Sequence, residues 1–167
     1  MRTLNFIVFV LFLLLLPLAV AAQTQKPLKD IAISVEGGKA LRLDASAFTK
    51  FPRTELKVKD HDGKESTYSG VELREILGAA GAKFGKDLRG PMIAQFLTVD
   101  AADGYHAVYS LTELDPEFSE QTVILADTKD GKPLDAKNGP WQIIASKEKK
   151  HARWVRQVAA LRVELAK

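Results

Sequence analysis

Cysteine is absent from this 167-residue chain, and methionine and tryptophan occur only twice each. A chain without thiols forms no disulfide, holds no metal through a thiolate and has no cysteine nucleophile. Its hydrophobic core alone must therefore supply the stability of the fold. The sequence also lacks a Gly-x-Ser-x-Gly motif and internal repeats, which argues against a hydrolase nucleophile elbow and against a repeat protein.

A strong excess of one charge is also missing. The chain carries 24 Lys and Arg against 21 Asp and Glu, for a net charge of +3. This balance gives no reason to expect a nucleic acid as partner. Basic side chains gather instead between residues 147 and 156, so we expect a local anion site there.

The first 22 residues are predicted to be a secretory signal peptide. Arg2 precedes an unbroken apolar run over residues 6–16, Pro17 ends that run, and small residues follow at 19–22. Cleavage is expected after Ala21 or Ala22, which predicts a periplasmic or secreted protein with no membrane attachment once cleaved. A membrane anchor is the alternative, because residues 6–22 reach the lower length limit of a membrane span. Residues 23–29 are then expected to form an exposed leader, and residues 30–167 one domain.

Alternating apolar and polar residues predict several strands. Two hairpins are expected, one from residues 31–35 and 40–43 and one from residues 55–59 and 65–68, with Asp62 and Gly63 in the second turn. Asp44 is expected to cap a short helix that ends at Phe48. Further strands are predicted over residues 96–99, 105–110, 121–126, 141–145 and 157–165, with the last two side by side. This pattern predicts an α+β domain with mixed, largely antiparallel sheets and a few short helices.

The main helix is predicted over residues 69–80. Ser69 and Glu72 have the spacing of a capping box. Apolar residues recur at helical spacing on one side, and Gly81 is placed to end the helix. The apolar residues of this stripe are Leu73, Ile76, Leu77 and Ala80.

Three blocks of sequence carry a family resemblance. The first reads Gly-Val-x-Leu-x-x-Ile-Leu over residues 70–77, and the second reads Ala-Asp-Gly-Tyr-x-Ala-x-Tyr-Ser-Leu-x-Glu-Leu over residues 102–114. The third is a Gly-Pro-led strand, a basic loop, an Ala-Arg-x-Val-Arg turn and a last strand, over residues 139–163. In order and spacing they resemble the molybdopterin-binding domain of the sulfite oxidase family of oxidoreductases.

The resemblance implies a sulfite-oxidase-like molybdopterin-binding fold and makes molybdopterin a possible cofactor. Enzymes of that family hold molybdenum through a cysteine thiolate, in a segment that corresponds here to residues 81–100. This segment contains no cysteine. The resemblance also places Arg153 and Arg156 where the family has basic residues near the pterin and its phosphate.

Arg153 and Arg156 are the leading candidates for ligand binding. Their three-residue spacing would direct both guanidinium groups to one side of a helical turn, where they could bind a phosphate or carboxylate in a shared pocket. The alternatives are a solvated charged loop for the basic residues, a core role for the tryptophan and a structural role for the histidine. The remaining candidates are Tyr105, His106, Lys150, His151 and Trp154.

No metal site is predicted. His61 lies between two aspartates, but adjacent residues of a hairpin turn do not converge on one ion, so the segment is interpreted as a simple turn. Acidic residues between 127 and 135 have the spacing of a calcium loop, but Asn138 stands where that loop needs glutamate.

Three functions remain open. The first is a protein that binds a small anionic ligand or a protein partner without its own redox centre. The second is a molybdopterin-dependent oxidoreductase, or a subunit of one, whose metal has no cysteine ligand. The third is a structural or adaptor domain that uses an exposed sheet edge.

Overall fold

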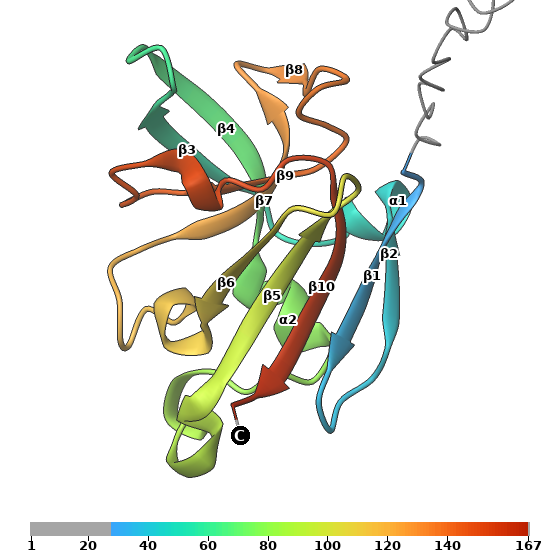
Figure 1. Ribbon diagram of the computed structural model, residues 1–167, viewed down its shortest axis with the longest axis vertical. Helices are drawn as coiled ribbons and strands as arrows, with labels where there is room; N and C mark the ends of the chain where they lie inside the picture. Colours follow the sequence, from blue (N-terminus) through green and yellow to red (C-terminus); the bar gives the residue numbers. More distant parts are fainter. Residues whose placement is uncertain (1–27, 167) are drawn as a thin grey trace, which may run out of the picture.

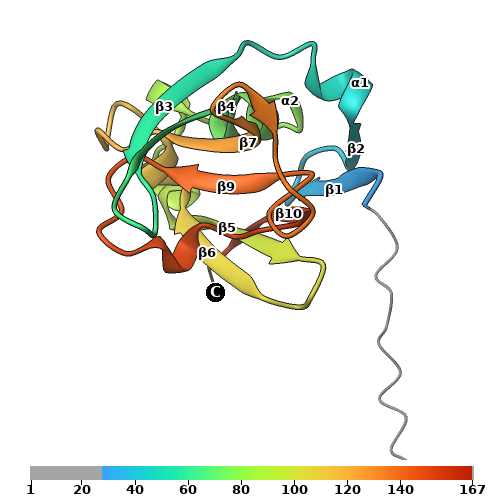
Figure 2. The same cartoon turned by 90° about the horizontal axis from the view of Figure 1, so that it is seen from above.

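The computed structural model describes residues 28–166, so the predicted signal peptide and residues 23–27 of the predicted leader lie outside the described residues. Within this range two five-stranded sheets are packed face to face, as two layers in Figure 2. In the same range, none of the helices has the length and apolar character needed to cross a membrane.

The first sheet has the strand order β2-β1-β10-β5-β6. Its members are β1 (Asp30–Val35), β2 (Leu41–Asp44), β5 (Gln95–Ala101), β6 (His106–Ser110) and β10 (Val158–Leu165). β1 and β10 run parallel, and the other pairs are antiparallel. The predicted first hairpin is confirmed, and Asp44 caps α1 (Ala45–Phe48) by accepting a hydrogen bond from the amide of Ala47.

The second sheet has the order β3-β4-β7-β8, with β9 also paired to β7. Its members are β3 (Thr54–Lys59), β4 (Glu65–Glu72), β7 (Val123–Lys129), β8 (Lys132–Pro133) and β9 (Gln142–Ala145). All of its pairs are antiparallel. The predicted α+β class with mixed, largely antiparallel sheets is therefore confirmed.

The prediction that the last two strands lie side by side is wrong. β9 belongs to the second sheet and β10 to the first (Figure 1), although backbone hydrogen bonds join the chain around the start of each strand. Ile143 donates to the carbonyl of Val155, and Val158 donates to that of Trp141. Alternation predicts which face of a strand is buried, and it does so correctly in β10: Leu161 and Val163 are buried, while Arg162 and Glu164 are exposed and Leu165 is half-buried. Alternation contains no information about which strand is the partner.

The predicted start of the main helix is also wrong. β4 continues to Glu72, and α2 spans Leu73–Ala79. Residues 69–72 pair with β7, so their amides belong to the sheet and no capping box forms at Ser69. The Glu72 carboxylate accepts instead from Arg74 Nε at 2.7 Å. A capping box does occur between Ser110 and Glu113, at the start of a 3-10 helix (Leu111–Leu114).

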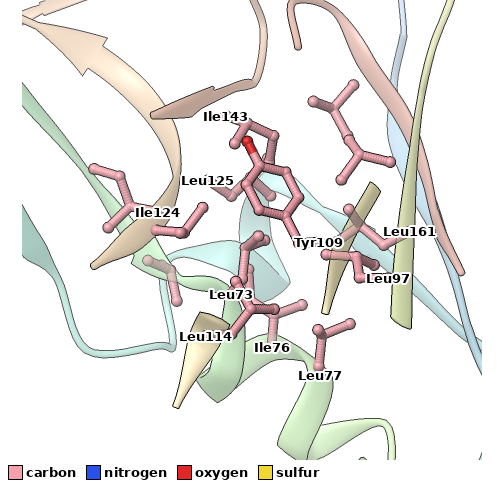
Figure 3. Packing of buried hydrophobic residues seen from close by; sticks show 14 of the residues in the cluster. Leu73, Ile76, Leu77, Leu97, Tyr109, Leu114, Ile124, Leu125, Ile143 and Leu161 are labelled. Carbon is pink, nitrogen blue, oxygen red and sulfur yellow. The ribbon is translucent and has the colours of Figure 1, made fainter. Parts of the chain in front are cut away.

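The core lies between the sheets and is closed at one end by α2 (Figure 3). The predicted apolar stripe of α2 is fully buried, and Gly81, with φ of +108°, ends the helix as expected. The stripe meets side chains from both inner sheet faces. Those labelled in Figure 3 include Leu97, Tyr109, Leu125, Ile143 and Leu161.

Candidate functional site

The basic loop between β9 and β10 is held to β6 by Arg153. This side chain lies in a 3-10 helix (His151–Arg153) and donates from Nε to Glu148 at 2.8 Å and from NH2 to Glu113 at 2.9 Å. It also donates to the carbonyl of Val108, and its guanidinium lies 4.3 Å from the ring centroid of Tyr109. Burial alone lowers the pKa of Arg153, but the two carboxylates outweigh this effect and raise it.

Two tyrosines fix the backbone of the same loop. Tyr105 OH donates to the carbonyl of Ala152, and Tyr109 OH donates to that of Arg153, each at 2.7 Å. Tyr109 is fully buried, whereas Tyr105 is 50% exposed. One tyrosine therefore belongs to the core and the other to the surface, and both position the loop.

Arg153 and Arg156 do not share a pocket, which corrects the prediction from their spacing. The 3-10 helix ends at Arg153, so the chain is no longer helical at Trp154 and the two side chains diverge. Arg153 is committed to Glu113 and Glu148. Arg156 lines a separate cleft and, among the described residues, has no carboxylate partner. Arg153 is thus structural, and Arg156 is the one of the two arginines that has no carboxylate partner among the described residues.

The cleft beside Arg156 has a volume of about 230 Å³. It lies between the His151–Arg156 segment, the turn before β6 and the turn between β3 and β4. Three of the other predicted site residues line it as well: Tyr105, His151 and Trp154. We call this the arginine cleft; its lining residues are His61, Ala101, Asp103, Tyr105, His151, Ala152, Trp154, Val155 and Arg156.

His61 belongs to this site, although the sequence interpretation assigned it to a simple turn. Its ring meets the ring of His151 edge to face, with centroids 4.6 Å apart. His151 in turn stacks on Trp154, with centroids 3.8 Å apart and planes 16° from parallel. Trp154 is 4% exposed, and its Nε1 donor has no hydrogen-bond partner among the described residues. The contact between positions 61 and 151 depends on how the two sheets pack, which local sequence does not reveal.

The turn that carries His61 is held by Asp60. Its carboxylate accepts from the His61 amide at 2.7 Å, from Tyr68 OH at 3.2 Å and from Lys129 Nζ. Burial alone raises the pKa of Asp60, but these hydrogen bonds outweigh it and lower the pKa. Burial, with the Asp60 charge beside it, raises the pKa of Tyr68 to about 12. The two histidine-bearing loops are thus each fixed by a charged anchor, one at Asp60 and one at Arg153.

The electrostatics of the cleft favour a neutral His151 at pH 7. Burial lowers the pKa of His151, and the neighbouring His61 lowers it further, while Asp60 and Glu148 oppose the shift. A bound anion would favour the imidazolium form, because an opposite charge nearby stabilises the charged state.

Two predicted site residues lie apart from the arginine cleft. His106 is exposed on β6, opposite Asp100 of β5, and does not line the cleft. Lys150 is exposed on the basic loop and likewise does not line it. The structure therefore brings together Tyr105, His151, Trp154 and Arg156 and separates them from the other candidates.

The described residues do not fit the metal chemistry that the resemblance implies. A thiolate ligand is impossible because the chain has no cysteine. Across residues 28–166 no group of three or more His, Asp or Glu side chains is placed to hold a metal ion. Arg153, which the resemblance puts near the pterin phosphate, is already bound to two carboxylates. No chemical step through molybdenum can be derived from this site.

Comparison with known proteins identifies the fold but no family. No family model matches the chain, and no curated protein matches it. Among solved structures, it is similar to the crystal structure of the sulfane dehydrogenase SoxCD from Paracoccus pantotrophus, with a TM-score of 0.61 and 17% sequence identity. The match covers 80% of this chain and 37% of that one, so this chain spans little more than a third of its neighbour. The predicted sulfite-oxidase-like molybdopterin-binding fold is thereby confirmed as a fold.

Proposed function

We propose that this protein is a binding module that takes a small anion in the arginine cleft without redox turnover. The observation that carries the proposal is Arg156, which lines a cleft with two imidazoles and has no carboxylate partner among the described residues. A guanidinium donates paired N–H groups in the geometry that a carboxylate or phosphate accepts. The buried face of the cleft is supplied by Trp154, which reduces the competition from water.

Titration calorimetry with inorganic phosphate and with acetate tests this proposal. Arg156→Gln should weaken binding about tenfold or more, because a hydrogen bond to a charged group contributes roughly 1.5–3 kcal/mol and 1.4 kcal/mol is tenfold. Lys150→Gln is the matched control, since it removes one positive charge from the same loop without changing the cleft. If Arg156→Gln and Lys150→Gln bind both anions equally well, the cleft is not the binding site.

The fold similarity favours a second candidate, a subunit of a molybdopterin-dependent oxidoreductase. The neighbour in the comparison is a dehydrogenase, and this chain corresponds to only part of it. In this candidate the metal ligands come from a group other than a cysteine of this chain, or from a partner protein. Purification from a host that makes the cofactor, followed by molybdenum analysis and pterin fluorescence after acid release, separates the two candidates. Stoichiometric molybdenum would support the second and argue against the first.

Export by the predicted signal peptide is part of both candidates. Its support is the sequence pattern of residues 1–22. N-terminal sequencing of the protein recovered from the periplasm or medium tests it, with Gln23 or Ala22 expected as the first residue. An uncleaved chain in the membrane fraction would favour the anchor alternative instead.

A further inference from the structure

A second cavity adjoins the arginine cleft and shares two residues with it. This cavity has a volume of about 460 Å³ and lies between the end of β3 and the basic loop. His151 and Trp154 line both cavities. The stacked pair thus lies between the two cavities. We call this second cavity the lysine cavity, after Lys57, Lys59 and Lys149 in its lining.

The charges of the lysine cavity favour an anion. Its lining contains three carboxylates, and each already has a cation: Asp60 is paired with Lys129, Glu65 with Lys57 and Glu148 with Arg153. Among the described residues, Lys59 and Lys149 have no such partner. Arg153 is shared between Glu148 and Glu113, so these side chains and their partners together leave one net positive charge, carried by the unpaired lysines. An anionic group that enters this cavity therefore meets uncompensated positive charge.

We propose that the two cavities form one site for an elongated dianion. This proposal rests on the proposed function. One anionic end binds Arg156, the linker passes the stacked ring of His151, and the other end binds Lys59 and Lys149. The ligand class is an organic dianion whose charged groups stand at the two ends of a short chain, such as an α,ω-dicarboxylate. Because the first contact holds the second end near its partner, the second contact forms at a high effective concentration and adds to the affinity.

The loop anchors support this assignment. Arg153 fixes the basic loop through Glu148 and Glu113, and Asp60 fixes the opposite turn. The spacing between Arg156 and Lys149 is therefore set by the fold before the ligand arrives. A fixed spacing selects a linker length, so affinity should rise to an optimum and then fall as the chain is lengthened.

The experiment is a double-mutant cycle with a series of dicarboxylates from succinate to suberate, and with acetate and butyrate as monoanions. Arg156→Gln, Lys149→Gln and the double variant are each titrated by calorimetry. For the dicarboxylate of best length, each single change should weaken binding about tenfold, which corresponds to 1.4 kcal/mol. The two losses should be coupled, because a dianion that loses one end binds as a monoanion. Acetate should respond to Arg156→Gln alone.

Lys150→Gln is again the matched control, because this lysine adjoins Lys149 in sequence but lines neither cavity. The variants should fold normally, since neither Lys149 nor Arg156 makes an ion pair with a described residue. Equal melting temperatures of the variants and the unaltered protein would verify this. If acetate binds through Arg156 but no dicarboxylate binds more tightly, or if Lys149→Gln behaves as Lys150→Gln, the elongated site is wrong and the small-anion cleft stands. If no anion binds the unaltered protein, the proposed function fails as well.

Discussion

His151 lies almost flat against Trp154, with ring centroids 3.8 Å apart. The indole covers one face of the imidazole, and the edge-to-face ring of His61 meets it as well. Both loops around this contact are tied down by charged side chains, so the imidazole is held in place by the fold. Because His151 lines the arginine cleft, the packing of the basic loop fixes the position of a titratable side chain in that cleft.

The pKa of His151 should lie below the ordinary histidine value. Burial lowers its pKa first and His61 adds to the shift, so the folded chain binds fewer protons than the unfolded chain just below pH 6.5. The resulting stability is fully present above about pH 6.5 and decreases as the pH falls toward the folded-state pKa. Histidine chemical shifts followed by NMR would measure this, and His61→Ala should move the pKa of His151 upward. An unchanged or lower pKa in that variant would contradict the assigned role of His61.

Arg153→Ala should destabilise the fold. The change leaves the 13%-exposed Glu148 carboxylate and the Glu113 carboxylate without their guanidinium partner. A loss of about 2 kcal/mol is expected for removing one member of a hydrogen-bonded charge network, which corresponds to roughly 4–8 °C in melting temperature for a domain of this size. Arg156→Ala is the matched comparison and should change stability by less than about 0.5 kcal/mol. Equal effects of the two changes on thermal melts would refute the division into a structural and a ligand-binding arginine.

The sequence predicted the strands and the buried faces well because those depend on local alternation. The predictions failed where pairing between residues far apart in the sequence decides the structure. Ser69 and Glu72 have the spacing of a capping box. The same segment pairs with β7 instead, so the local cap does not form. β9 and β10 were predicted to lie side by side, but they belong to different sheets.

The predictions for the candidate site divide in the same way, between residues close together in the sequence and residues far apart. Tyr105, His151, Trp154 and Arg156 were proposed from the sequence, where they lie in two short blocks, and the structure places them around one cleft. The pairing of Arg153 with Glu113 was not, because Glu113 lies 40 residues earlier in the chain. His61 was missed for the same reason: its importance comes from a ring 90 positions away, which becomes its neighbour only after the sheets have packed.

Gly70→Ala should be strongly destabilising, whereas Gly78→Ala should stabilise the protein. A β-carbon at Gly70 would lie 2.1 Å from the carbonyl oxygen of Leu125, inside the β4–β7 ladder. The backbone of β7 cannot move away without disturbing its pairing with β4. A loss of about 2–3 kcal/mol is expected from this clash. At the exposed Gly78 in α2 nothing lies within 4 Å of the added carbon, so alanine should gain about 0.5–1 kcal/mol from helix propensity. Urea unfolding of the two variants measures both, and a Gly70→Ala variant as stable as the unaltered protein would disprove the close β4–β7 approach.

Tyr109→Phe and Tyr105→Phe should show how much a buried and an exposed hydrogen bond each contribute to holding the basic loop. Both phenols donate to loop carbonyls at 2.7 Å, but Tyr109 is fully buried and Tyr105 is half-exposed. Water can replace the phenol at Ala152, whereas the carbonyl of Arg153 would lose one of its two donors in a dry setting and keep only the Val155 amide. Tyr109→Phe should therefore cost about 1–2 kcal/mol, since an unmade buried hydrogen bond carries a desolvation penalty, and Tyr105→Phe less than about 0.5 kcal/mol. Hydrogen exchange of the amides of residues 151–156, together with unfolding curves, would measure the difference: faster exchange is expected for Tyr109→Phe. Equal protection of the loop in the two variants would mean that the salt bridges of Arg153 hold it without help from the phenol beneath.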